Sequence, residues 1–205
     1  KMTEVKPGVF VFDLGQSMAG FAELRVSGPS GTKVVMEYGE RLAKDGTVDR
    51  ADIEQHVVRT DATQQFQTDT YILKGQGTEV WRSRFTYHGF QYVEVTGLPG
   101  KPSLDNLRGV FIHSGLSKAG EFECSNPLFS KVLRAGRYSY LSNLQGIPTD
   151  CPHREKNGWT GDAHIAAEQA LFNYEPEAVY TKWINDLGDE QRPTGELPGI
   201  VPTSG

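Results

Sequence analysis

The spacing of apolar residues changes once along this chain of 205 residues, and that change most constrains its fold. From Gly8 to about Gly115, short runs rich in β-branched and aromatic residues alternate with glycine-marked turns, a pattern typical of an antiparallel β-sandwich. After Glu123, apolar residues recur at helical spacing. Because the strands come first and the helices follow, the sequence predicts a β domain at residues 1–115 and a separate helical domain at residues 116–205.

Six runs in the first part are predicted as strands because they are rich in β-branched and aromatic residues. They are Val9–Leu14, Phe21–Val26, Lys33–Tyr38, Phe66–Leu73, Arg84–Val95 and Leu107–His113. The segments 27–31 and 97–100 combine glycine with proline and separate these runs, and Asp45-Gly46 suits a tight turn. The segment 75–77 is expected to be only a turn. The first domain is therefore predicted to bury one face of each strand and expose the other.

Three helices are predicted in the second part. Asn126 is a candidate N-cap for the first helix, and Pro127 suits its first position because the missing N–H costs nothing there. The helix is expected to stop at Gly146. A second helix is expected from about Thr160 to Phe172, and a third opens at Pro176.

Charge and composition exclude several classes of partner. The 21 Lys and Arg residues against 26 Asp and Glu residues give a net charge of −5, which disfavours a nucleic-acid backbone or an anionic membrane as partner. The sequence holds no apolar run of membrane-spanning length, and its first residues lack the apolar region of a signal peptide, which we expect to be either absent or already cut away. The compartment stays open between the cytoplasm and the periplasm or exterior. Cys124 and Cys151 cannot build a disulfide framework and are taken as free thiols.

Residues 149–164 carry the densest set of chemically capable side chains, between the first two predicted helices. The connection holds three carboxylates, two glycines and a tryptophan, and it is longer than most links between helices, which indicates use in binding or catalysis. The alternative is a polar loop that is merely solvated.

The string Asp-Cys-Pro-x-Arg-x-x-x-Gly-Trp-x-Gly-Asp at residues 150–162 resembles the catalytic-region signature of bacterial α-L-rhamnosidases, glycoside hydrolase family 78. Residues 38–42 followed by Asp45-Gly46, and residues 85–95, resemble the β-sandwich that precedes the barrel in that family. The resemblance spans residues 8–205. It implies a sandwich followed by the first helices of an (α/α)6 barrel, and an inverting enzyme that needs no metal or other cofactor. The implied substrates are rhamnose-containing glycosides or polysaccharides, from which terminal L-rhamnose is released.

The resemblance assigns roles to five residues. Glu155 matches the general acid, and Asp150 and Asp162 match carboxylates that bind the sugar. Trp159 and Arg154 occupy the aromatic and arginine positions of the substrate site. A general acid must keep its proton near neutral pH, which the neighbouring carboxylates and partial burial under Trp159 would favour. Arg154 and Lys156 are accordingly expected to point elsewhere or to pair with the two aspartates.

Two of these assignments have structural alternatives. Asp162 falls in the first turn of the second predicted helix, where the helix dipole favours an anion whether or not it binds sugar. Trp159 is a candidate for stacking on the apolar face of the sugar, and equally for packing in a core.

The second catalytic carboxylate is expected outside this chain. Inversion needs a base roughly 6.5–9.5 Å from the acid, with water between them, and in the family this is a glutamate from a much later helix. Three helices are too few for a ring of twelve, so the chain is expected to be a fragment with half an active site. It is predicted to be inactive alone, with the remainder of the barrel as its partner. Six other acids lack a motif that would give them this role: Glu168, Glu175, Glu177, Asp186, Asp189 and Glu190.

Other chemistries receive little support. The spacing of Cys151, His153 and His164 fits no standard zinc pattern, and no Gly-x-Ser-x-Gly elbow is present. A non-catalytic carbohydrate-binding or scaffolding sandwich remains the alternative function. It draws on three aromatic residues that are otherwise expected in the strand core, namely Tyr87, Phe90 and Tyr92. Residues 194–199 resemble a barrel loop that borders the sugar pocket in the family, and no residue of this segment is given a role.

Overall fold

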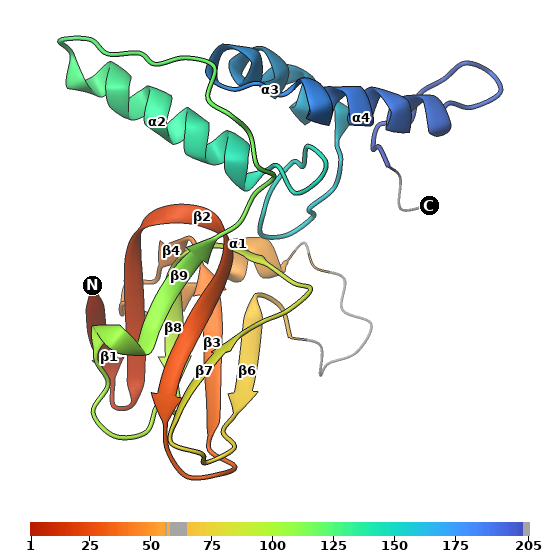
Figure 1. The fold of residues 1–205 in the computed structure, drawn as a ribbon. Coiled ribbons are helices and arrows are strands. Elements are labelled where there is room, and N and C mark those ends of the chain that lie inside the picture. Colours follow the sequence, from red (N-terminus) through yellow and green to blue (C-terminus); the bar gives the residue numbers. More distant parts are fainter. Residues whose placement is uncertain (56, 58–64, 203–205) are drawn as a thin grey trace. The chain divides into compact units, whose positions relative to one another are not determined.

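A computed structural model describes residues 1–55, 57 and 65–202 of the chain (Figure 1). It divides into two compact units, Lys1–Ile112 and His113–Gly205. The first unit consists mainly of strands and the second of helices, as the sequence predicts.

The first unit is built on one antiparallel sheet. Seven strands of the described residues pair in this sheet, with β2 (Val9–Ser27) at its centre. The other six are β1 (Met2–Lys6), β3 (Lys33–Gly39), β6 (Thr68–Ile72), β7 (Thr78–Arg82), β8 (His88–Thr96) and β9 (Leu107–Phe111). A smaller sheet pairs β4 (Arg41–Leu42) with β5 (Val48–Asp49). The short helices α1 (Ala51–Glu54) and η1 (Leu104–Asn106) lie in the connections.

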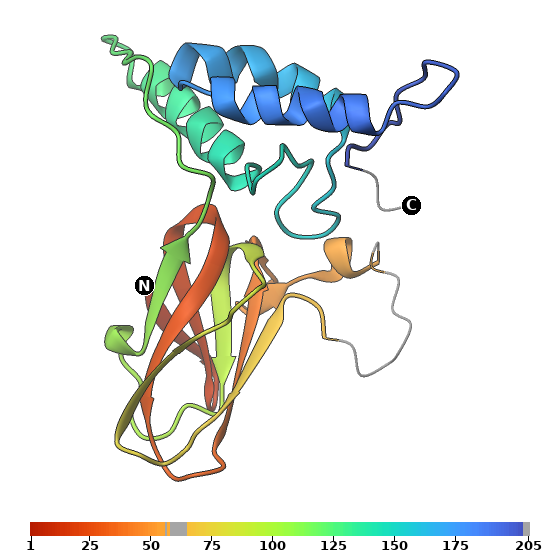
Figure 2. The same cartoon turned by 45° about the vertical axis from the view of Figure 1, so that its right-hand side comes forward.

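β2 changes neighbours along its length and so turns one sheet into the layers of a sandwich (Figure 2). Its first part pairs with β1 and β8, and its last part with β9 and β7. The exchange falls at Gly20, which pairs with both His88 and Phe111. A Cβ atom on Gly20 would lie 1.9 Å from the carbonyl oxygen of Val110, so only glycine permits this approach.

The prediction of separate strands at Val9–Leu14 and Phe21–Val26 was therefore wrong about the break between them. The residues between them form an irregularity in the pairing with β8, which lies between Asp13 and Met18, rather than a turn. Gly15 absorbs it with a φ of 75°. A glycine in a strand pattern can mark either a bulge or a turn, and here the strand continues on both sides.

The sandwich core follows the two-residue period of the strands. Phe12 of β2 lies beside Val93 of β8, which in turn pairs with Tyr38 of β3. All three side chains are buried, together with Leu24 of β2 and Met36 of β3. The strand prediction for Lys33–Tyr38 is confirmed. Its alternate residues Val34, Met36 and Tyr38 are buried, as the two-residue period of a strand requires.

One strand prediction needs correction, and two strands were not predicted. Arg84–Tyr87 is not part of a strand, and β8 starts only at His88. Phe85 has a φ of 62° and is fully exposed, so the apolar alternation at this point did not reflect a buried face. The turn at residues 75–77 is confirmed, with positive φ at Gly75 and Gly77, but the sequence did not predict β7 immediately after it. β1 was missed as well.

The second unit contains the three predicted helices, α2 (Pro127–Ser142), α3 (Thr160–Asn173) and α4 (Glu177–Asp189). The cap prediction is confirmed, because the Asn126 side chain accepts a hydrogen bond of 3.0 Å from the backbone N–H of Leu128. A small core joins the helices through Tyr140, Leu144, Ala170 and Tyr174. Large apolar side chains remain exposed on every helix, among them Phe129, Ile165, Phe172 and Ile184. None of the helices in the described ranges has both the length and the apolar character needed to cross a bilayer.

Candidate active site

The connection between α2 and α3 is closed by a pair of hydrogen bonds between Asp150 and Asn157. The backbone N–H of Asp150 donates to the carbonyl oxygen of Asn157 at 3.0 Å. The backbone N–H of Asn157 donates in return to Asp150 Oδ1 at 2.9 Å. Lys156 adopts the left-handed conformation, with a φ of 55°, which lets the chain return on itself. Residues 151–156 are thus held in a short, fixed turn that carries Glu155.

Cys151 fills the interior of this turn. Its side chain is buried, and its Sγ donates a hydrogen bond to Asp150 Oδ2 at 3.0 Å. The same sulfur accepts a bond of 3.3 Å from the backbone N–H of Glu155. Burial is the largest influence and raises the pKa of the Cys151 thiol, the bond to Asp150 raises it further, and neighbouring backbone N–H groups oppose both. Cys151 is therefore a neutral thiol that links the Asp150 carboxylate to the backbone of Glu155.

The Glu155 carboxylate lies between an indole and a guanidinium. Trp159 Nε1 donates a hydrogen bond of 2.9 Å to Glu155 Oε2. Arg154 Nε lies 3.5 Å from Glu155 Oε1, and both side chains are about one-third exposed, at 35% and 37%. The expectation that Arg154 turns away from Glu155 was therefore wrong. Asp150 instead accepts its bonds from Cys151 and from the backbone of Asn157.

Trp159 is held by a segment far along the chain. It forms an isolated antiparallel bridge with Ile200. The N–H of Thr160 donates to the carbonyl of Gly199 at 2.9 Å, and the N–H of Val201 donates to the carbonyl of Gly158 at 2.8 Å. The sequence reasoning singled out residues 194–199 but missed this pairing, since a single bridge leaves no periodic signal.

Asp162 makes no direct contact of this kind with the other candidate residues that the structure describes. It is exposed in the first turn of α3, where the helix N-terminus favours a negative charge. Within residues 1–55, 57 and 65–202, no hydrogen bond or ion pair joins Asp162 to Asp150 or Glu155. The contacts thus bring together Asp150, Glu155, Arg154 and Trp159, with Cys151 as an unpredicted member. Over the same described residues, no three His, Cys, Asp or Glu side chains are grouped to hold a metal ion.

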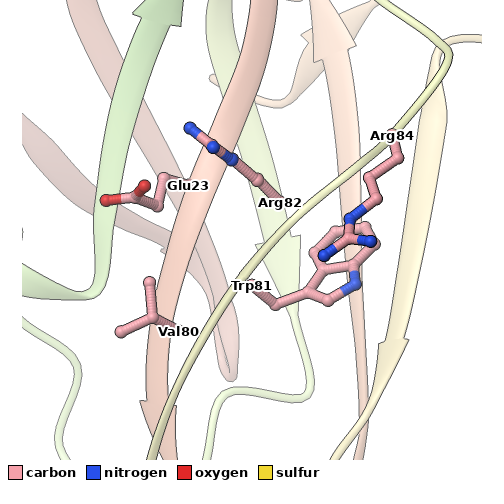
Figure 3. A pocket seen from close by; sticks show the side chains of 5 residues that line it. All are labelled: Glu23, Val80, Trp81, Arg82 and Arg84. Atoms are coloured by element: carbon pink, nitrogen blue, oxygen red, sulfur yellow. The ribbon is translucent and has the colours of Figure 1, made fainter.

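The sandwich carries a separate open hollow, shown in Figure 3. Five residues line it, namely Glu23, Val80, Trp81, Arg82 and Arg84. Trp81 and Arg82 are consecutive on β7 and point to opposite sides of the strand (Figure 3). Arg82 lies 5.9 Å from the ring centre of Phe21, and Glu23 accepts a bond of 2.7 Å from Arg108. Of the three aromatics considered for a sugar platform, Phe90 is fully buried in the core.

The fold and the site define a class of chain in which an antiparallel β-sandwich precedes a helical domain whose first interhelical loop carries several carboxylates. Residues 3–113 match the family model described as the bacterial alpha-L-rhamnosidase concanavalin-like domain. Residues 117–205 match that of the bacterial alpha-L-rhamnosidase 6 hairpin glycosidase domain. The chain belongs to the bacterial α-L-rhamnosidase family, and the predicted resemblance is confirmed.

Named relatives agree with this assignment. An alpha-L-rhamnosidase of Streptomyces avermitilis is 44% identical over 206 residues, covering 100% of this chain and 19% of the relative. One of Formosa agariphila is 37% identical over 201 residues, covering 96% of this chain and 21% of the relative. The chain therefore spans about a fifth of the length of these relatives.

Solved structures agree as well. The Streptomyces avermitilis alpha-L-rhamnosidase complexed with L-rhamnose gives a TM-score of 0.92 at 44% identity, covering 100% of this chain and 19% of that one. The alpha-L-rhamnosidase from Dictyoglumus thermophilum gives 0.90 at 40% identity, covering 98% of this chain and 22% of that one. The predicted order, a β-sandwich and then the start of a helical barrel, is confirmed.

Proposed function

We propose that these residues belong to an inverting glycosidase that removes terminal α-L-rhamnose from glycosides, with Glu155 as its general acid. The observation that carries the proposal is that the turn closed by Asp150 and Asn157 presents the Glu155 carboxyl group, with one oxygen hydrogen-bonded to Trp159. The names of relatives at 37–44% identity support rhamnose as the sugar.

Glu155 acts by giving its proton to the glycosidic oxygen as the bond from that oxygen to the anomeric carbon breaks. The leaving alcohol departs neutral, and a carboxylate remains on Glu155. The indole N–H of Trp159 donates a hydrogen bond to this carboxylate, and the guanidinium of Arg154, 3.5 Å from its other oxygen, stabilises the new charge electrostatically. Water attacks the opposite face of the sugar, and a base that we place beyond Gly205 takes its proton.

Asp150 and Asp162 are proposed to bind sugar hydroxyl groups. Each Asp150 oxygen accepts one bond within the loop, from Cys151 or from Asn157, and retains a second lone pair for a ligand. Asp162 is exposed and free to accept such bonds. Trp159 is 39% exposed, which we take to leave part of its ring face for the apolar side of rhamnose.

A sugar-binding or scaffolding role for the sandwich is the second candidate function. The hollow lined by Trp81, Arg82 and Arg84 favours it, because indole and guanidinium groups are suited to sugar faces and hydroxyl groups. This role needs no proton donor at residue 155, so the two functions are separated by one substitution.

The test is Glu155→Gln in a full-length enzyme that contains this chain. An alkyl rhamnoside has a poor leaving group, so its hydrolysis should fall about 10²- to 10⁴-fold, which is the usual worth of a general acid. L-rhamnose should still bind, as measured by titration calorimetry. Glu168→Gln, which changes an exposed acid on α3, is the control and should keep wild-type rates.

Wild-type turnover of the alkyl rhamnoside by Glu155→Gln would overturn the acid assignment. The 205 residues alone should hydrolyse neither alkyl nor aryl rhamnosides, because the proposed base is absent from them. Measurable turnover by the isolated chain would contradict that placement of the base.

A further inference from the structure

We propose that Trp159 is a positioning residue for Glu155, and that the bridge between residues 158–160 and 199–201 fixes the place of its indole. The inference rests on the proposed role of Glu155 as acid. It goes further by giving the N–H of Trp159 a function in addition to that of its ring face, and by giving residues 199–201 a function.

The contact between the two side chains is direct. Trp159 Nε1 lies 2.9 Å from Glu155 Oε2, an ordinary length for a strong N–H···O bond. An indole N–H can only donate, so this bond selects one orientation of the carboxyl group. The Glu155 side chain is about one-third exposed and would otherwise sample several rotamers. The indole therefore restricts the acid to one placement above its turn.

The indole itself is fixed by the backbone around it. Residues 158–160 and 199–201 exchange two backbone hydrogen bonds, of 2.8 and 2.9 Å. The hydroxyl of Thr160 adds a third bond, of 3.1 Å, to the carbonyl of Gly199. Val201 is fully buried, and its carbonyl accepts a bond of 3.4 Å from Trp183 of α4. The bridge thus connects Trp159 to the core of the helical unit.

Gly158 shows how closely the two segments approach. A Cβ atom there would lie 2.0 Å from the carbonyl oxygen of Val201, and that oxygen belongs to rigid backbone. Gly161, three residues later, has nothing within 4 Å of such an atom. Alanine at position 158 must therefore open the bridge, whereas alanine at position 161 leaves it intact.

The effect of a misplaced acid on the hydrolysis rate depends on the leaving group of the substrate. An alkyl leaving group needs protonation as it departs, whereas an activated aryl leaving group, such as nitrophenolate, departs with little help. The ratio of kcat on an alkyl rhamnoside to kcat on a nitrophenyl rhamnoside therefore reports the placement of Glu155. A loss of folded enzyme lowers both rates equally and leaves the ratio unchanged.

The first experiment is Trp159→Phe in the full-length enzyme. Phenylalanine keeps an aromatic face for the sugar and removes the N–H. The alkyl-to-aryl ratio should fall about tenfold, the order expected for a small misplacement of a catalytic group, while KM on both substrates changes much less. An unchanged alkyl-to-aryl ratio, whether or not kcat falls on both substrates, would overturn the proposal. A rise in KM with kcat unchanged would overturn it as well.

The second experiment compares Gly158→Ala with Gly161→Ala. Gly158→Ala should lower the alkyl-to-aryl ratio in the same direction as Trp159→Phe, and Gly161→Ala should match the wild-type ratio. Equal ratios in the two alanine variants would remove the bridge from the proposal.

Glu155→Gln, measured in parallel, separates this inference from the proposed function. If that variant keeps alkyl rhamnosidase activity, the acid assignment itself is wrong. If it loses the activity while Trp159→Phe keeps the wild-type ratio, only the positioning role fails.

Discussion

The hydroxyl of Tyr38 donates a hydrogen bond of 2.8 Å to Asp69 Oδ2 inside the β-sandwich. His88 Nε2 lies 3.1 Å from the same oxygen, and the His88 ring stacks on Tyr38 with 4.1 Å between centres. Burial alone would raise the pKa of the Asp69 carboxyl. The hydrogen bond and charge of His88, together with the hydroxyl of Tyr38, outweigh burial and hold that pKa below its ordinary value.

Asp69→Asn should destabilise the chain at pH 7 by about 1–3 kcal/mol, because it disrupts a buried network of hydrogen bonds to a charged group. A carboxyl whose pKa is lowered by folding stabilises above its unfolded pKa, about 3.9, and loses that contribution as the pH falls through the folded value. The difference between wild type and Asp69→Asn should therefore narrow below about pH 4. Urea unfolding at pH 7 and pH 3, followed by circular dichroism, measures both.

Asp105→Asn serves as the control for this prediction, since Asp105 is an exposed residue of η1 in the same unit. It should unfold with the wild type at both pH values. The difference in free energy of unfolding between the wild type and Asp69→Asn should be smaller at pH 3 than at pH 7. An equal difference at the two pH values would mean that the carboxylate charge contributes nothing to stability.

Sequence patterns predicted the local features of this fold but not the features that depend on distant strands. The period-two pattern of Lys33–Tyr38 predicted a strand, and Asn126-Pro127 predicted the start of α2, because both signals are local. The continuity of β2 through Gly15 was not predictable in the same way. It depends on β8 and β9, which contribute pairing partners from some 70 to 90 residues away.

In the candidate site, too, local features were predictable from the sequence and long-range contacts were not. The motif at residues 150–162 predicted Asp150, Glu155 and Trp159 as site residues, and the structure places Trp159 against Glu155. Neither composition nor spacing could show that Arg154 approaches Glu155, since that depends on how the turn at residues 151–156 directs the two side chains. Residues 199–201 contribute only backbone groups to the site, so their side chains gave no signal.

The two thiols of the chain should react at very different rates. Cys124 is exposed, whereas Cys151 is buried, and burial raises the pKa of its thiol. Because the thiolate is the reactive form, iodoacetamide at pH 8 should alkylate Cys124 at least about tenfold faster than Cys151 in the folded chain. Peptide mass spectrometry over a time course measures both rates.

Denaturant provides the control for the thiol prediction. In about 6 M guanidinium, which unfolds the chain fully, the two rates should converge, because burial and the bond to Asp150 are lost. Equal rates in the folded chain would show that the turn around Cys151 opens freely.

Arg137 should make a substantial polar contribution to the stability of the helical unit. Its Nε donates to Asn173 Oδ1 at 2.7 Å, and its Nη2 donates to the carbonyl of Gly120 at 2.7 Å, so one guanidinium joins α2 to the end of α3 and to the segment before α2. Lysine keeps the charge but cannot hold both acceptors in a planar fork. Arg137→Lys should therefore cost about 1–2 kcal/mol and lower the melting temperature by several degrees. Arg134→Lys, an exposed change on the same helix, is the matched control. Thermal unfolding by circular dichroism compares them, and equal melting temperatures for the two variants would show that the fork of Arg137 adds nothing beyond its charge.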